Sequence, residues 1–194
     1  MTNKELEILL KNQLNKFELS NSYGHRAVGD KLEADTINVL KKFVPHNLVE
    51  AKSNRSIDDF TLVFDKSINL FDIKTHFIQV KSGFSMPNLI SVKRLKTVLE
   101  DNTKNLSYIF IDYIRQDGDV VIKDVHVKYI WELDWSILTI GSLGKGQLQI
   151  KDANKNLLFT NIGKEEWFEI LKTKVIDFYN KELSKINKEL KLWQ

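Results

Sequence analysis

The chain has 194 residues, of which 42% are hydrophobic and 28% are charged, and this balance excludes an intrinsically disordered protein. A chain of this length is expected to fold as a single domain, 1–194, with a sizeable core. It contains no cysteine, which excludes a disulfide framework and a thiolate metal site. Its net charge of +3 permits nucleic-acid binding without demanding it.

The sequence shows no pattern typical of a membrane-spanning or secretory segment. It has no run of eighteen apolar residues, and its first seven residues, MTNKELE, do not have the pattern of a signal peptide. We therefore expect a cytoplasmic protein without a membrane partner.

The first third of the chain predicts two helices and a short strand. Leucines recur at helical spacing in 4–17, and apolar residues do so again in 24–43, a helix that Val44 and Pro45 would end. A short apolar strand at 48–51 follows. The apolar positions of the second helix are Val28, Leu32, Ile37, Leu40 and Phe43.

Two strands with a tight connection, 57–65 and 70–77, predict a hairpin. Alternation places phenylalanines on one face of the first strand and leaves Asp59 on the other face. In the second strand Asp72, Lys74 and His76 share a face, and Ile73 points the opposite way. If the apolar faces coincide, the turn folds Asp59 back beside Asp72 and Lys74.

Two carboxylates held together repel, and each raises the pKa of the other unless a cation neutralises them. Mg²⁺ prefers oxygen ligands and is usually held by one or two carboxylates, several waters and phosphate oxygens. A neighbouring lysine can orient water or stabilise charge on a phosphate. Asp59, Asp72 and Lys74 therefore predict a magnesium-dependent phosphodiesterase site.

The second half of the chain predicts further alternating elements. We expect a helix at 88–101 and a strand at 106–114 that is buried on both faces. Strands at 120–122 and 125–131 and a glycine-punctuated hairpin over 138–150 follow. The segment 164–193 is predicted as a long amphipathic helix or helix pair. Its apolar spacings of three and four contain one slip, which favours a packed helix over a long coiled coil.

Basic residues follow the predicted site closely, with Lys81, Lys93 and Arg94 among them. Such residues can hold a phosphate backbone, although a solvated helix face would look the same. In the glycine-punctuated segment, Lys145 can contact phosphate or guanine and Gln147 can bond adenine, or the segment can be a plain hairpin tip.

Asp59, a gap of twelve residues and then Asp72-Ile73-Lys74-Thr75 resemble the PD-(D/E)XK nuclease motif, in the form found in type II restriction endonucleases. The proline that usually precedes the first acid is absent. This departure leaves Asp58 and Asp59 as alternatives for the first ligand, and strand phase favours Asp59.

The resemblance implies an α/β fold with a restriction endonuclease-like core at about 24–130, in which helices flank a central mixed sheet. The region 131–163 would contact DNA, and 164–194 would form a long C-terminal helix. Asp59, Asp72 and the carbonyl of Ile73 would hold Mg²⁺, Lys74 would position water, and Glu33 would join from the helix. The implied protein is a homodimer that cuts double-stranded DNA at a short palindrome, alongside a cognate DNA methyltransferase.

Two alternatives stay open. Gln79-Val80-Lys81 resembles the variant motif of the Mrr-like branch, with Asp65 or Asp72 as partner acid, although that assignment needs a strand break near His76. In function, the chain could be a repair or junction-resolving nuclease of the same fold, or an inactive DNA-binding module. The four histidines are scattered along the chain and predict no zinc site.

Overall fold

The structure is a computed structural model that describes residues 1–14, 19–20, 24–51, 56–64, 67–78, 88–117, 119–141, 146–151 and 157–193. Lys81, Lys145, Asp65 and the Gln79-Val80-Lys81 triplet lie outside the described residues. The elements in chain order are α1 (Asn3–Leu14), β1 (Leu19–Ser20), α2 (His25–Phe43), β2 (Leu48–Glu50), β3 (Phe60–Phe64), β4 (Ser67–Phe77), β5 (Asn88–Ser91), α3 (Val92–Leu99), β6 (Lys104–Gln116), β7 (Asp119–Tyr129), the 3-10 turn η1 (Ile130–Glu132), β8 (Leu138–Gly141), β9 (Gln147–Ile150) and α4 (Lys164–Leu190).

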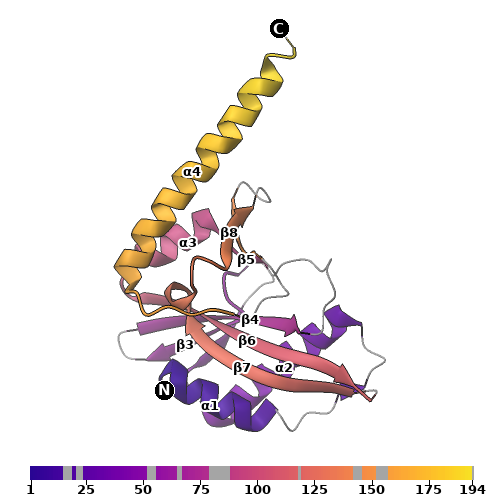
Figure 1. Cartoon of the computed structure of the whole chain (residues 1–194). Helices are drawn as coiled ribbons and strands as arrows, with labels where there is room; N and C mark the ends of the chain where they lie inside the picture. The colour runs from indigo at the N-terminus through magenta and orange to yellow at the C-terminus, as the bar shows by residue number, and fades with distance from the viewer. Residues whose placement is uncertain are drawn as a thin grey trace.

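The central sheet has the strand order β1-β7-β6-β4-β3-β2 (Figure 1). β4 and β6 run parallel, whereas β3 pairs antiparallel with β4 and β7 pairs antiparallel with β6. The sheet is therefore mixed, as predicted. β6 is buried on both faces from Leu106 to Ile111, which confirms the reading of that strand as a central one.

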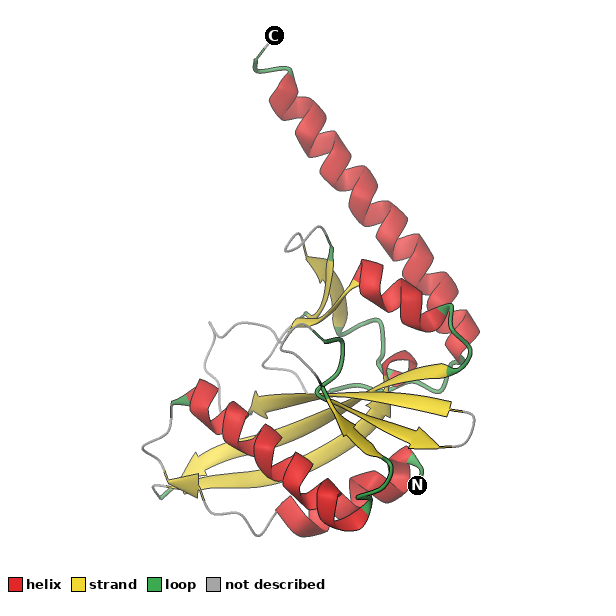
Figure 2. Ribbon diagram, turned by 180° about the vertical axis from the view of Figure 1, so that it is seen from behind, coloured by secondary structure: helices red, strands yellow, loops and turns green. Residues whose placement is uncertain are grey.

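Each face of the sheet carries its own apolar cluster. On one face, the leucines of α1 and α2, among them Leu10 and Leu32, pack with Phe60 and Ile109. On the other face, Leu95 of α3 and Trp167 of α4 pack with Tyr108 and Phe110. Figure 2 shows α1 and α2 together on one side of the sheet, with α3 and α4 on the other. The helices thus flank the sheet, and the mixed α/β class is confirmed.

The predicted helix over 88–101 is too long at its start. Residues Asn88–Ser91 form β5, which pairs with β9, and the helix begins only at Val92. Ser91 caps it, because its hydroxyl accepts a hydrogen bond from the backbone N–H of Arg94. The pattern of apolar residues could not predict this boundary, because the strand that pairs with 88–91 lies more than fifty residues further along the chain.

Two other predictions are corrected in detail. The strands expected at 120–122 and 125–131 are one strand, β7, and the register against β6 shifts between the Tyr113–Ile122 and Asp112–Asp124 pairs. A bulge at this place accounts for the break in the alternating pattern. The segment 164–193 was predicted as either one long helix or a helix pair, and it forms the single helix α4.

No helix within the described ranges is both long enough and apolar enough to cross a membrane.

Candidate active site

The hairpin of β3 and β4 opens at Asp59. Backbone pairing runs from Phe64–Ser67 to Phe60–Phe71, and the N–H of Asp59 then donates to the carbonyl of Phe71 at 2.8 Å. The next donor on β4, the N–H of Ile73, is taken by the Asp59 side-chain oxygen Oδ2 at 2.6 Å. Asp59 therefore replaces a backbone partner where the strands diverge, and this bond holds its carboxylate beside Asp72.

Asp72 is 6% exposed and points from β4 into the site. The pKa of its carboxyl is raised to about 7, chiefly by burial; Lys74 lowers this pKa and the neighbouring Asp59 carboxylate raises it. The Lys74 ammonium contacts Asp72 Oδ1 at 2.5 Å. Asp72 and Lys74 share one face of β4, as predicted. The strand expected over 57–65 begins only at Phe60, and Asp59 reaches the same place from the residue before β3.

Glu33 enters from α2. Burial raises the pKa of its carboxyl, and so does the nearby charge of Asp59, while Lys74 lowers it. Glu33 lines a pocket of about 180 Å³ together with Glu50, Asp58 and Asp59. The pocket beside the carboxylate pair is therefore acidic and would attract a cation.

Asp58 has a different environment from Asp59, because its Oδ2 accepts a hydrogen bond from the Thr61 hydroxyl at 2.6 Å. The backbone of Ile73 is held by Asp59 and not by Asp58. Of the two candidates for the first ligand, the geometry favours Asp59.

The donor set suits a hard cation that keeps much of its water. Within the described residues, no three or more Asp, Glu, His or Cys side chains are grouped so as to hold a metal ion. Asp59 and Asp72 nevertheless form a carboxylate pair, and burial of Asp72 disfavours its charged form in the absence of a cation. Mg²⁺ is commonly bound by only one or two carboxylates, so these residues fit it.

Three of the predicted DNA-contacting residues lie in one corner. Lys93 and Arg94 are exposed in the first turn of α3, and Gln147 opens β9 opposite Ser91. The N–H of Val92 donates to the carbonyl of Gly146 at 3.0 Å, so the start of α3 and the start of β9 are tied together. The structure does not place Lys81 or Lys145, which lie outside the described residues.

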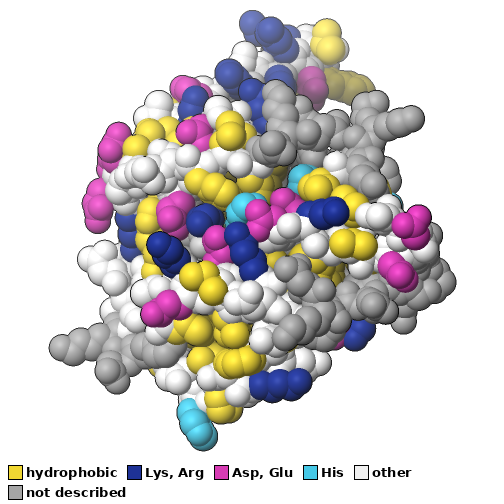
Figure 3. Space-filling view, turned by 60° about the horizontal axis from the view of Figure 1, so that its bottom comes forward, with side chains coloured by type: hydrophobic (Ala, Val, Ile, Leu, Met, Phe, Trp, Pro, Cys, Tyr) yellow, Lys and Arg dark blue, Asp and Glu magenta, His cyan; other side chains and the backbone are white. Residues whose placement is uncertain are grey.

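A histidine pair on the same face was missed by sequence reasoning. His76 Nδ1 lies 3.0 Å from Asp112 Oδ1, and His126 Nε2 lies 3.8 Å from the other oxygen of Asp112. Asp124 approaches His126 from β7 at 3.6 Å. Charged and histidine side chains gather across the middle of the face shown in Figure 3. The only signal in the sequence was that His76 shares the phase of Asp72 and Lys74.

Tyr108 of β6 stands opposite Asp72 in the parallel register and is 0% exposed. Burial raises the pKa of its hydroxyl well above the usual value, and the charges of Asp72 and Asp59 add to this. Its hydroxyl oxygen finds no hydrogen-bond partner among the described residues. A buried donor without a partner costs stability.

We therefore expect Tyr108→Phe to raise the free energy of unfolding by about 1 kcal/mol, because it removes an unsatisfied buried hydroxyl. Urea denaturation in EDTA measures this value. Tyr113→Phe is the matched control, since the Tyr113 hydroxyl lies 3.0 Å from His25 Nδ1 and its loss should lower stability. A Tyr108→Phe variant that is less stable than the wild type would show that the hydroxyl is satisfied in solution.

Comparison with known proteins supports the fold. No protein-family model and no curated protein sequence matches the chain. Among solved structures, the NlaIV restriction endonuclease superposes with a TM-score of 0.57 and 16% sequence identity, over 80% of this chain and 70% of that chain. The chain therefore has a restriction endonuclease-like fold.

Proposed function

We propose that the protein is a Mg²⁺-dependent endonuclease that hydrolyses double-stranded DNA, and more closely a type II restriction endonuclease. One observation carries the proposal: the strands β3 and β4 diverge where Asp59, Asp72 and Lys74 meet, and the Asp72 carboxyl is buried with a pKa of about 7. Perturbed carboxylates of this kind concentrate at functional sites. The fold shared with a restriction endonuclease supports the same class of chemistry.

Each residue has a role in this proposal. The carboxylates of Asp59 and Asp72 and the carbonyl of Ile73 would hold Mg²⁺, which when bound supplies positive charge beside the phosphate. With the carboxylates neutralised, the Lys74 ammonium is available to orient the attacking water by hydrogen bonding. Glu33 adds a carboxylate from α2 that can accept a proton from that water. Hydrolysis then forms a bond between the water oxygen and phosphorus and breaks the bond from phosphorus to a sugar oxygen.

The DNA would run past the basic corner of Lys93, Arg94 and Gln147, with Lys81 and Lys145 as further contacts. A homodimer would present two sites to the two strands of a short palindrome. A cognate DNA methyltransferase in the same cytoplasm would protect the host DNA, as the type II assignment requires.

Digestion of a sequenced plasmid with Mg²⁺ or with EDTA tests the proposal. We expect discrete fragments with Mg²⁺ and intact plasmid with EDTA, and sequencing of the fragment ends gives the site and the stagger. A smear or structure-dependent nicking would indicate a repair or junction-resolving nuclease instead. DNA binding without cleavage at any Mg²⁺ concentration would indicate an inactive DNA-binding module and would refute the proposed nuclease activity.

A further inference from the structure

A groove runs between the second half of α4 and the hairpin of β8 and β9. The helix contacts β8, and two pockets of about 460 Å³ and 420 Å³ lie along this contact. Both pockets are lined by Ile140 of β8 and by Phe178 and Lys181 of α4, so they are parts of one groove, which we call the α4 groove. Among the described residues that line it, none belongs to α2, β3 or β4. The α4 groove is therefore separate from the candidate active site.

The α4 groove is basic. Its lining carries two carboxylates, Asp177 and Glu182, and a larger number of lysines, which are Lys151, Lys174, Lys181, Lys185 and Lys188. Lys185 pairs with Glu182 at 2.5 Å. Within the part of the chain that the structure describes, the other four lysines form no ion pair. Positive charge is thus in excess along the groove and is available to a ligand.

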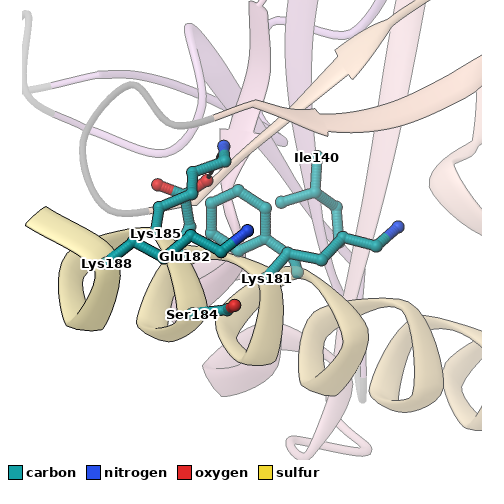
Figure 4. Close-up of a pocket in the computed structure, with 7 residues that line it drawn as sticks. Ile140, Lys181, Glu182, Ser184, Lys185 and Lys188 are labelled. Atoms are coloured by element: carbon teal, nitrogen blue, oxygen red, sulfur yellow. Dashed lines mark hydrogen bonds and ion pairs between the residues drawn. The ribbon is translucent and has the colours of Figure 1, made fainter.

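The lysines of α4 form a row. Lys174, Lys181, Lys185 and Lys188 are separated by seven, four and three residues, so they share one side of the helix. Figure 4 shows the last three of them beside Ile140 of β8. With a rise of 1.5 Å per residue, the row is about 21 Å long, which is the axial length of about six phosphates in one strand of a DNA duplex. A row of this length suits an extended polyanion better than a small anion.

The α4 groove continues from the basic corner of Lys93, Arg94 and Gln147. Gly146 immediately precedes this glutamine, and a side chain at Gly146 would meet the Tyr179 hydroxyl of α4 at 3.3 Å. The helix therefore passes directly beside the start of β9. At the other end of β9, Lys151 follows Ile150 and lines the groove. The two basic surfaces are thus joined through β9.

We propose that the α4 groove binds the sugar–phosphate backbone of double-stranded DNA, outside the base pairs that the active site cuts. The choice of DNA as the polyanion rests on the proposed nuclease function. Lysine ammonium groups meet phosphates as point charges, and such contacts hold a duplex in place without reading its bases. The regular row along a helix matches the even spacing of phosphates better than the irregular charges of an acidic protein surface. The groove would extend the length of DNA that one subunit holds.

DNA binding by the full chain in EDTA tests the groove. The probe is a fluorescent duplex of about 40 base pairs, and anisotropy gives the Kd over a range of salt concentrations. The double substitution Lys181→Gln and Lys188→Gln should weaken binding by about 10-fold or more in 0.1 M salt. The slope of log K against log salt should become shallower by nearly 2, because about 0.9 is lost for each phosphate contact.

The matched control is the double substitution Lys4→Gln and Lys42→Gln. It removes the same charge from exposed positions of α1 and α2, which lie on the other side of the sheet from α3 and α4 (Figure 2). Its Kd and salt slope should stay close to those of the wild type. Both double variants should melt as the wild type does, since all four lysines are exposed.

Photo-cross-linking tests the position of the DNA. The chain has no cysteine, so Ser184→Cys introduces a single thiol that can carry a photoreactive label within the α4 groove. The labelled protein should cross-link to the duplex, whereas the same label at Lys4→Cys should not. A duplex that is cross-linked equally from both positions, or only from Lys4→Cys, overturns the placement.

The outcomes separate this inference from the nuclease proposal, because binding is measured without cleavage. A wild type that cuts DNA, but whose Lys181→Gln and Lys188→Gln variant keeps the wild-type Kd and salt slope, overturns the groove and leaves the nuclease; an acidic protein would then be the better candidate ligand. A wild type that binds the duplex with the expected loss in the variant, but never cuts, supports the groove and refutes the nuclease. A wild type that binds no duplex overturns both.

Discussion

Replacing Lys74 with alanine is expected to slow DNA cleavage by about 10³-fold, because a charged group that positions water or stabilises the transition state is typically worth this much. Binding of DNA should be largely retained, since Lys74 is one cation among many near the backbone. The rate is measured in single-turnover digestion with Mg²⁺, and binding is measured by gel shift in EDTA.

The structure adds a second effect to the same substitution. Lys74 is the counter-ion that lowers the pKa of Asp72, so its removal should raise that pKa further and weaken metal binding near neutral pH. A higher pH or more Mg²⁺ should restore metal binding without restoring the rate. Lys172→Ala is the control, because Lys172 is exposed on α4 and pairs with Glu169 at 2.6 Å. Cleavage at the wild-type rate by Lys74→Ala would remove Lys74 from the mechanism.

Replacing Asp72 with asparagine is expected to abolish cleavage and also to stabilise the metal-free protein. The folded pKa of Asp72, about 7, lies above the ordinary value of 3.8, so the folded state binds more protons than the unfolded state between these values. Stability contributed by the protonated carboxyl is therefore present at low pH and is lost as the pH rises toward 7. The asparagine side chain is neutral at every pH, so the variant does not lose this stability.

Thermal and urea denaturation in EDTA should show the Asp72→Asn variant more stable than the wild type by about 2–4 kcal/mol at pH 8, since each pKa unit corresponds to about 1.4 kcal/mol. At pH 4 the two proteins should differ little. Asp101→Asn is an informative control with the opposite sign, because hydrogen bonds from Lys104 and Thr103 lower the pKa of Asp101, and its replacement should reduce stability at pH 8. A wild type that is more stable than Asp72→Asn at pH 8 without metal would mean that the carboxylate is compensated in the folded protein.

The relation between Asp72 and the proposed metal can be followed in the same measurement. Mg²⁺ should stabilise the wild type, because an ion that binds only the folded state shifts the unfolding equilibrium. It should have a much smaller effect on Asp72→Asn. The buried Asp72 carboxylate would then lower the stability of the metal-free protein and increase its affinity for the cation.

Much of the fold could be predicted because the relevant patterns are local. Alternation along 60–77 predicted the hairpin and the common face of Asp72 and Lys74, and the burial of β6 followed from its unbroken apolar run. The predicted start of α3 failed where a distant partner overrode local preference, since residues Asn88–Ser91 pair with β9. The bulge in β7 was likewise decided by pairing with β6.

The candidate site shows the same division. Its residues Asp59, Asp72 and Lys74 were found from strand phase and motif spacing. Two contacts at the site could not be predicted. One is the hydrogen bond from the Ile73 N–H to Asp59, which distinguishes Asp59 from Asp58 as the first ligand. The other is the contact of both His76 and His126 with Asp112. These contacts depend on how β3, β4, β6 and β7 are ordered and registered.

The sequence by itself determined the type of each long element and the face on which its charged residues lie, because side-chain direction in a strand or helix repeats with a short, known period. The tertiary structure alone decided how deeply Asp72 is buried, which carboxylate accompanies it and where α4 leaves the body. Burial and electrostatic compensation arise from contacts between residues far apart in the chain, and no local period encodes them.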